Sequence, residues 1–271
     1  MNKICVCGAA GRMGRRIIAC AAEMDELTIS GAAECNGHPC LGQDAGILAG
    51  IPATGVILTD SLQDAIRDAD VVIDFALATG VPERANVYAE AGTALVMGTT
   101  AIEESGLQAL TEAAESIAVL HAPNFSIGVN LLFALVRQAA GALDERYDAE
   151  VIEMHHRRKK DAPSGTAVQL VEMIEEGRDV ERGSSIVYGR QGITGERPAG
   201  EIGVHAVRGG DVAGEHTIIF ATEGERIELT HKASNRDTFA RGALKAALYL
   251  TGKQAGMYSM NDVLGFTRET T

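Results

Sequence analysis

The chain has 271 residues, of which 46% are apolar and 23% charged, and its formal net charge is −13. These values are typical of a globular protein with one large domain or two smaller ones. The excess of acidic side chains argues against nonspecific nucleic-acid binding, and no apolar run is long enough to span a membrane. The N-terminal segment lacks the apolar region of a secretory signal, so we expect a soluble, cytoplasmic protein.

The first half of the chain alternates short β-branched runs with helical patterns. Such alternation predicts a doubly wound parallel sheet with helices on both faces, as in Rossmann-like α/β folds. Ser61 and Asp64 are spaced to cap one of the helices. The expected strands are 3–8, 27–34, 55–59, 71–76, 94–98 and 117–124, and the expected helices are 11–24, 61–69, 81–92 and 102–116.

The pattern changes after residue 126. A long helix over 127–146 is followed by five strand-like runs at 149–154, 184–189, 201–207, 214–222 and 225–231, with one helix at 167–176. Glu223 and Gly224 form a hairpin signal between the last two runs. We predict an α+β domain with an open, mostly antiparallel sheet over 127–234, which binds substrate and forms oligomers. A closing helix over 238–252 would return to the dinucleotide-binding domain, composed of 1–126 and 235–271.

Three glycines, Gly8, Gly11 and Gly14, separate the first predicted strand from the first helix. A helix N-terminus with glycines beside it can hold a pyrophosphate, and an acid that ends the second strand, here Glu34, can bind ribose hydroxyls. The alternative is a turn that only packs the helix on the strand. We expect a dinucleotide to contact Gly8, Ala9, Ala10, Gly11, Arg12, Met13, Gly14 and Glu34.

The residues after Glu34 bear on the choice of coenzyme. Cys35 and Asn36 follow it, where an arginine could have met a 2′-phosphate, so NADH is favoured over NADPH. A nearby arginine of the first helix could still reach such a phosphate. Two further strand ends should approach the coenzyme, because ligands of open α/β sheets lie beyond the carboxyl ends of the strands. They comprise Gly98, Thr99 and Thr100, which could also form a plain helix-capping turn, and Ala122, Pro123, Asn124 and Phe125.

All five cysteines lie in the first 40 residues. Their odd number, and the shared strand face of Cys5 and Cys7, indicate free thiols. Cys35, His38 and Cys40 could form half a metal site, but no second cluster completes four ligands, so we expect no metal.

The segment HHRRKKDAPSGTA, residues 155–167, places four cations and two histidines before a turn in an otherwise acidic chain. Thr166 and Gln169 fit a capping box at the start of the next helix. The backbone N–H groups of Gly165 and Thr166 would then lie beside the cations, an arrangement suited to one or two carboxylates. The alternative is a solvated basic loop.

The chain resembles the 4-hydroxy-tetrahydrodipicolinate reductase family, formerly called dihydrodipicolinate reductases, of the diaminopimelate route to lysine. The resemblance rests on GAAGRMGR, DFA, GTT, NFSIGVN, E-x-HHRRKKDAPSGTA, GERPAGEIGVHAVRGGDVAGEHT and ERIELTHKASNRDTFARGAL, nearly the whole chain. It implies NAD(P)H-dependent reduction of a cyclic dicarboxylate with loss of water, and a homotetramer built through the second domain's sheet. Some family members have an arginine where this chain has Cys35.

The resemblance also implies roles for individual residues. His155 would be the proton donor and Lys159 its catalytic partner, which is reasonable because a histidine titrates near neutrality and a cation can stabilise the negative charge left by hydride addition. His156, Gly165 and Thr166 would hold the substrate carboxylates, with Arg236 assisting. Arg157, Arg158 and Lys160 are expected to act only as surrounding charges or in ion pairs.

Two other readings of the sequence remain open. Another two-domain NAD(P)-dependent amino-acid dehydrogenase would share the glycine turn but would not need paired histidines before a cationic helix start. A non-catalytic dinucleotide sensor would bind coenzyme without oxidising it. His205, His216 and His231 are expected on the second sheet's faces or at subunit contacts.

Overall fold

The computed structural model describes residues 1–183 and 185–266, so position 184 of the expected strand 184–189 lies outside the described residues. The chain divides into two compact units. The first comprises Met1–Ile127 and the chain from Arg236 onward, and the second is Gly128–Asn235. Within the described part of the chain, no helix is both long enough and apolar enough to cross a membrane.

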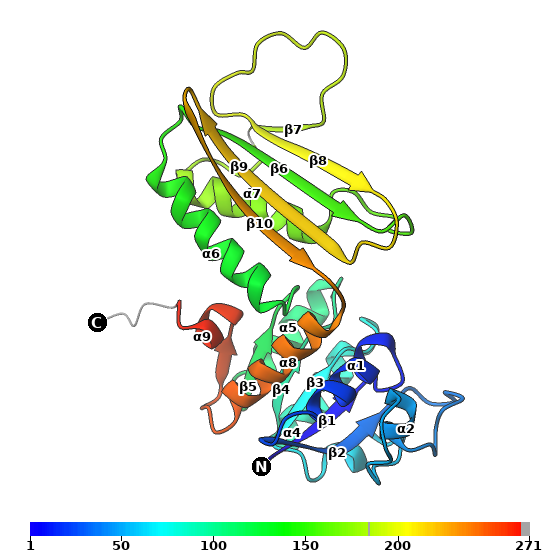
Figure 1. The fold of residues 1–271 in the computed structure, drawn as a ribbon. Helices are drawn as coiled ribbons and strands as arrows, with labels where there is room; N and C mark the ends of the chain where they lie inside the picture. The colour runs from blue at the N-terminus through cyan, green and yellow to red at the C-terminus, as the bar shows by residue number, and fades with distance from the viewer. Residues whose placement is uncertain (184, 267–271) are drawn as a thin grey trace. The chain divides into compact units, whose positions relative to one another are not determined.

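The first unit contains a six-stranded sheet in the order β11-β5-β4-β3-β1-β2, with every pairing parallel (Figure 1). The strand order reverses between β1 and β3, which is the switch point where open α/β sheets bind ligands. The predicted doubly wound sheet is therefore confirmed. Its strands are β1 (Asn2–Cys7), β2 (Leu27–Ala33), β3 (Val71–Asp74), β4 (Ala94–Met97), β5 (Ala118–His121) and β11 (Gly256–Tyr258).

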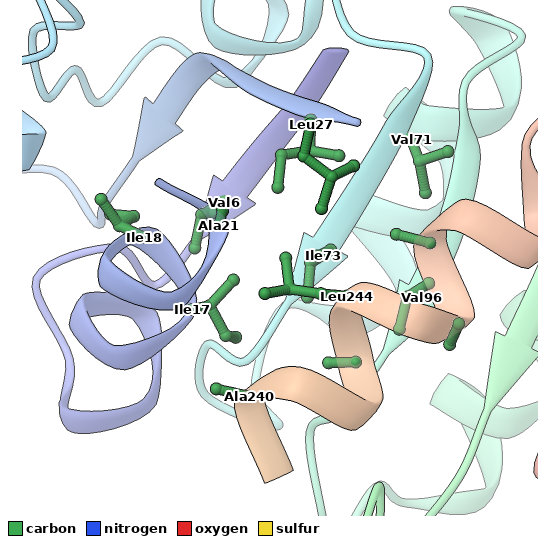
Figure 2. Close-up of a cluster of buried hydrophobic side chains, with 14 of the residues drawn as sticks. Val6, Ile17, Ile18, Ala21, Leu27, Val71, Ile73, Val96, Ala240 and Leu244 are labelled. Carbon is green, nitrogen blue, oxygen red and sulfur yellow. The ribbon is translucent and has the colours of Figure 1, made fainter. Parts of the chain in front are cut away.

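Successive residues of each buried strand point to opposite faces, so both faces of this sheet are apolar. Helices cover both of them. On one face, Val6, Ile73 and Val96 pack against α1 and α8, as Figure 2 shows for Ile17 and Leu244. A second apolar cluster, on the other face, contains Cys5 and Cys7 with side chains of α4 and α5. The helices are α1 (Arg12–Ala21), α2 (Ala45–Ala49), α3 (Leu62–Ile66), α4 (Val81–Glu90), α5 (Glu104–Ala113), α8 (Asp237–Leu250) and α9 (Met260–Leu264).

The strand predicted over 55–59 is wrong. That segment makes only isolated bridges, one between Ala33 and Thr59 and one between Asp44 and Ile57. Gly55 has φ of +78°, and the Asp44 carboxylate accepts hydrogen bonds from the N–H groups of Thr54 and Gly55. These contacts bend the segment into a loop. The short elements α2, α9 and β11 were not predicted from the sequence.

The second unit contains a five-stranded sheet in the order β10-β9-β6-β8-β7. The strands are β6 (Asp148–His155), β7 (Ile186–Tyr188), β8 (Ile202–Arg208), β9 (Gly214–Thr222) and β10 (Glu225–Ala233). Strand β9 runs antiparallel to β6 and β10, whereas β8 runs parallel to β6 and β7. The sheet is thus mixed, and the expectation of a mostly antiparallel sheet is corrected. The predicted hairpin at Glu223 and Gly224 is confirmed, since Thr222 pairs with Glu225.

Helices α6 (Ile127–Ala142) and α7 (Gly165–Arg178) bury the apolar side chains on one face of this sheet. Val136 of α6 and Leu170 of α7 are fully buried in the same cluster as Val151 of β6. Helix α6 ends earlier than predicted, before Asp144, whose carboxylate accepts the N–H of Arg146 at 3.0 Å and forms a turn.

Candidate active site

The turn between β1 and α1 lies at the switch point of the first sheet. Gly8 has φ of +76°, a conformation that glycine adopts without strain. A Cβ on Gly14 would lie 2.2 Å from the Gly8 carbonyl oxygen, so only glycine lets α1 begin this close to the turn. Gly11 is the N-cap of α1 and has no side chain to cap it. The turn thus presents the start of a helix, with its partial positive charge, to a ligand.

A pocket of about 560 Å³ opens beside this turn. Gly8, Gly11 and Glu34 line it together, so the structure brings the glycine turn and the predicted ribose acid to one place. The Glu34 carboxylate accepts hydrogen bonds from the N–H groups of Ala10 at 3.2 Å and Cys35 at 3.1 Å. The remaining lining residues are Cys7, Ala33, Cys35, Asn36, His38, Asp60, Leu62, Phe75, Ala76, Leu77, Thr79 and Arg84. The volume of the pocket, the glycine turn and the carboxylate of Glu34 together fit a dinucleotide.

The two other predicted coenzyme segments meet around Phe75, which the sequence analysis did not single out. A Cβ on Gly98 would lie 2.2 Å from the Phe75 ring, and the Phe125 ring centroid is 5.6 Å from that of Phe75. The Thr99 hydroxyl donates to the Ala76 carbonyl at 3.1 Å. The Phe125 side chain is buried, so it packs in the core. Ala122, Pro123 and Asn124 follow β5 at the same edge of the sheet.

Asp74, at the end of β3, holds the loop that lines this pocket. Its fully buried carboxylate accepts hydrogen bonds from the Ala76 N–H at 2.9 Å, the Arg84 Nε at 2.8 Å and the Tyr88 hydroxyl at 2.9 Å. Arg84 also donates to two carbonyl oxygens of the loop 77–79. Asp74 thus orients the turn after β3 and forms a buried ion pair with Arg84.

In the second unit, strand register gathers four polar side chains on one face of the sheet. His155 of β6 pairs with Arg208 of β8, and Glu153 of β6 pairs with His216 of β9. Paired residues of neighbouring strands point to the same face, and residues two apart on one strand share it. This is the face that α6 and α7 cover, since Val151 lies two positions before Glu153 and belongs to the apolar cluster.

Glu153 is fully buried, and its carboxylate receives four hydrogen bonds. Arg208 donates two, at 2.8 and 2.7 Å, the Ser164 N–H donates one at 3.0 Å, and Nδ1 of His155 lies 2.6 Å away. Burial acts to raise the pKa of Glu153, but the hydrogen bonds from Arg208 and His155 outweigh it and hold that pKa below its usual value. Glu153 is therefore ionised at neutral pH.

His155 lies at the end of β6 with its side chain only 12% exposed. Burial lowers the pKa of His155 below its ordinary value, although Glu153 opposes this, and the charges of Lys159 and Arg208 lower it further. An added Cβ on Gly214 would lie 3.0 Å from Nε2 of the ring. The imidazole is thus confined by Glu153 on one side and by the Gly214 backbone on the other.

The N-cap of α7 is Ser164, so the predicted capping box of Thr166 and Gln169 is wrong. The Ser164 hydroxyl accepts the Ala167 N–H at 3.2 Å, and Gly165 and Thr166 fall within the first helical turn. Ser164 and Thr166 both carry hydroxyl groups that could cap a helix. The hydrogen bond from the Ser164 N–H to Glu153 selects the earlier start. A Cβ on Gly165 would meet no atom within 4 Å.

His216 joins this cluster from β9. Its Nε2 lies 3.1 Å from the Ser164 hydroxyl, and its ring is edge-on to that of His155 with centroids 5.2 Å apart. Burial lowers the pKa of His216 to about 4, so the ring is neutral at neutral pH. Its position on a sheet face was expected, whereas its contact with His155 was not.

The basic loop after β6 divides into inner and outer cations. Lys159 is half-buried, and its ammonium lies 2.8 Å from the Asp161 carboxylate. Nδ1 of His156 is buried and, among the described residues, has no hydrogen-bond partner. Arg157, Arg158 and Lys160 are exposed. Lys159 and Arg208 are close enough to His155 for their charges to lower its pKa.

Arg236 belongs to the first unit, where it is the N-cap of α8.

In the loop after β2, Nδ1 of His38 accepts the Cys40 N–H at 3.2 Å. No three His, Cys, Asp or Glu side chains in the described ranges are grouped in a way that could hold a metal ion. His205, on the other face of the second sheet, pairs with Glu150 at 2.8 Å.

Glu153 and Arg208 were not among the residues predicted for the site, and His216 was expected only on a sheet face or at a subunit contact. One signal was available for Glu153. It continues the inward positions of Ala149 and Val151 along β6, and an acid at an inward position must be paired. Its partners come from strands far along the chain, which a pattern within one strand does not identify.

Comparison with known proteins agrees over both units. The family model described as "Dihydrodipicolinate reductase, N-terminus" matches residues 2–125, and "Dihydrodipicolinate reductase, C-terminus" matches 128–264. A 4-hydroxy-tetrahydrodipicolinate reductase of Anaeromyxobacter sp. (strain Fw109-5) is 50% identical over 265 residues, covering 98% of each chain. One of Geobacter sulfurreducens is 46% identical over 267 residues, covering 98% of this chain and 99% of the relative.

A solved structure supports the same grouping. Dipicolinate-bound dihydrodipicolinate reductase from Paenisporosarcina sp. TG-14 superposes with a TM-score of 0.75 at 26% identity, covering 96% of this chain and 97% of that one. A Mycobacterium smegmatis amine dehydrogenase shares the fold alone, with a TM-score of 0.61 at 12% identity. On the two family models and relatives at 46–50% identity, the chain belongs to the 4-hydroxy-tetrahydrodipicolinate reductase family of NAD(P)H-dependent oxidoreductases.

Proposed function

We propose that the chain reduces 4-hydroxy-tetrahydrodipicolinate to tetrahydrodipicolinate with loss of water, and that the cluster around His155 performs the proton transfer. Membership of the family supports the reaction. The observation that carries the residue assignment is the hydrogen bond between His155 and the buried Glu153, beside the start of α7 and the basic loop. Such a set of groups suits a small dicarboxylate that accepts a proton as it is reduced.

The substrate carboxylates bind at the start of α7. The N–H groups of Gly165 and Thr166 belong to the first helical turn, where the helix dipole favours an anion. His156 supports one carboxylate through its side chain. The open space at Gly165 lets a ligand approach the backbone closely.

The reduction adds one hydride and one proton to the unsaturated ring left by loss of water. A bound nicotinamide coenzyme supplies the hydride. His155 gives the proton from Nε2, since Nδ1 is engaged by Glu153. Lys159 stabilises the negative charge that hydride addition leaves on the conjugated ring.

The coenzyme binds at the glycine turn of the first unit, and NADH is preferred. Glu34 and Asp60 both line the pocket, and carboxylates repel the 2′-phosphate of NADPH while accepting ribose hydroxyls. Cys35, beside Glu34, offers no positive charge. Saturation curves with the two coenzymes test this preference, and an equal kcat/KM for NADPH would contradict it.

The protein assembles as a homotetramer in the cytoplasm, through the sheet face of the second unit that α6 and α7 leave uncovered. Val207 is 43% exposed on that face, with Ile152 and Ile219 also on it. Light scattering should give four times the chain mass of 28.5 kDa, and a monomer mass would overturn this part of the proposal.

A coupled assay tests the reaction. Aspartate semialdehyde, pyruvate and the upstream synthase would generate the substrate, and NADH consumption should depend on this chain. Lys159→Ala should lower kcat by about 10²-fold or more, the size expected when a group that stabilises developing charge is lost. Lys160→Ala, an exposed neighbour, is the matched control and should retain activity. A wild-type chain that binds NADH without oxidising it would favour a dinucleotide sensor instead.

A further inference from the structure

The contact between His155 and Glu153 defines which ring nitrogen is free. A buried, ionised carboxylate only accepts hydrogen bonds, so at 2.6 Å the Nδ1 of His155 must carry a proton. In the neutral ring, Nε2 then holds the lone pair, and in the protonated ring Nε2–H is the transferable proton. This orientation places the acid function on the ring edge next to Gly214.

Arg208 fixes the carboxylate that makes this contact. Its guanidinium binds both oxygens of Glu153 at 2.8 and 2.7 Å, and it is held in turn by the carbonyl oxygens of Val207 and Asp161 at 2.7 and 2.8 Å. A two-point arginine–carboxylate pair leaves the carboxylate little rotational freedom. The Glu153 carboxylate that orients the ring of His155 is therefore itself immobilised by Arg208.

The same carboxylate reaches the start of α7. It accepts the Ser164 N–H at 3.0 Å, and Ser164 caps the helix whose first turn contains Gly165 and Thr166. One buried charge thus sets both the orientation of His155 and the position of the helix terminus. A shift of about 1 Å in such a geometry can lower a rate about 10²-fold.

We propose that Glu153, clamped by Arg208, is the positioning residue of the active site: it fixes the orientation and tautomer of His155, so that Nε2 delivers the proton, and it aligns that nitrogen with the start of α7. This inference rests on the proposed function of His155 as proton donor. After transfer to the substrate ring, His155 is neutral with its proton retained on Nδ1, and it regains the second proton from solvent. Neither Glu153 nor Arg208 changes its charge in the cycle.

The decisive variant is Glu153→Gln, which keeps the side-chain shape and removes the charge. The new amide can donate to Nδ1, which would move the single proton of neutral His155 to Nε2. We expect kcat to fall about 10²- to 10⁴-fold, the upper figure being the loss seen when a catalytic histidine's aspartate becomes asparagine in serine proteases. NADH affinity should stay within about twofold, because the groups that line the coenzyme pocket are elsewhere in the chain.

Two readouts separate positioning from a structural role. The alkaline limb of kcat/KM should move to lower pH in Glu153→Gln, because loss of the carboxylate lowers the pKa of His155 further. Nitrogen NMR of histidine-labelled protein without substrate should show neutral His155 protonated at Nδ1 in the wild type and at Nε2 in the variant. Glu153→Asp, which keeps the charge, should recover part of kcat and leave the pH limb near its wild-type place.

Glu176→Gln is the control for the loss of a paired carboxylate. Glu176 lies on α7, and its exposed side chain pairs with the exposed Arg182 at 2.8 Å, away from the His155 cluster and from the uncovered face of the sheet. We expect its kcat to change less than about threefold. An equal loss in this control, an unshifted pH limb, or a wild-type His155 protonated at Nε2 would each overturn the proposal.

The NMR measurement also separates the two proposals. If the wild type shows the Nδ1–H tautomer and Glu153→Gln reverses it, the positioning role stands even when no reductase activity is found in the coupled assay. If Glu153→Gln does not fold by circular dichroism, the wild-type tautomer together with the kinetics of Glu153→Asp decides.

Discussion

The backbone of Gly214 bounds the space that the imidazole of His155 occupies, because a Cβ at position 214 would lie only 3.0 Å from Nε2. A contact this short forces either the backbone or the ring to shift. Because Glu153 anchors the ring at Nδ1, a shift of the ring would displace Nε2, the nitrogen that we assign to proton transfer.

Gly214→Ala should therefore lower kcat by up to about tenfold, because the added methyl group displaces Nε2 by a few tenths of an ångström and the φ of +156° strains a residue with a side chain. Its NADH affinity should remain that of the wild type. Gly209→Ala is the control, because a Cβ there would meet only the flexible methyl end of Met154. Steady-state kinetics of the two variants measure the difference, and a wild-type kcat in Gly214→Ala would show that Nε2 is not confined as described.

Asp74→Asn tests the buried ion pair that holds the coenzyme loop. The substitution leaves Arg84, whose side chain is 16% exposed, without its counter-charge. Removing one partner of a buried pair lowers the free energy of unfolding by about 3–5 kcal/mol, and the loosened loop should also weaken NADH binding. Asp64→Asn, in an exposed pair with Arg67, should change stability by less than about 1 kcal/mol. Urea unfolding and coenzyme titration of both variants provide the measurement, and equal stabilities would contradict the role of Asp74.

Cys35→Arg tests the coenzyme preference. Cys35 is exposed and lines the pocket beside Glu34, so an arginine can be accommodated and can meet a 2′-phosphate. A hydrogen bond to a charged group contributes about 1.5–3 kcal/mol, so the ratio of kcat/KM for NADPH to that for NADH should rise at least about tenfold. Cys35→Ser keeps the pocket uncharged and should leave the ratio unchanged. An unchanged ratio in Cys35→Arg would place the adenosine ribose elsewhere.

His216 should make the stability of the protein depend on pH. Its pKa is about 4 in the folded chain against 6.5 as its ordinary value, so between these values the unfolded chain binds a proton that the folded chain does not. The free energy of unfolding should therefore fall as pH drops from about 6.5 to 4, by up to about 3 kcal/mol from this group. Above pH 6.5 the ring is neutral in both states and contributes no pH dependence.

His216→Gln removes the titrating ring and should flatten this part of the curve. Thermal unfolding at several pH values between 4 and 7 compares the variant with the wild type. If both lose stability equally across this range, His216 does not carry the pH dependence.

Much of the fold could be read from the sequence because its signals are local. The glycine turn, the continuous apolar runs of β1 and β3, and the apolar face of α7 each depend on neighbours within a few positions, as does the cap at Ser61. Backbone sterics and helical or strand periodicity suffice to predict these features. The two-residue hairpin between β9 and β10 belongs to the same class.

Other features depend on partners that are remote in the chain. The N-cap at Ser164 instead of Thr166 is selected by a buried carboxylate on β6, and the loop at 55–59 by the carboxylate of Asp44. The direction of β8 relative to β6 cannot be predicted from the alternation of inward and outward side chains along either strand, because parallel and antiparallel neighbours show the same period.

By itself the sequence determined the two kinds of unit, the coenzyme turn and the basic segment that ends in a helix. Only the tertiary structure decided that Glu153, Arg208 and His216 surround His155, since strand register sets which residues face one another across 50 or more positions. Register follows from how the whole buried face packs, and a slip of one residue would turn each of these side chains to the opposite face of the sheet.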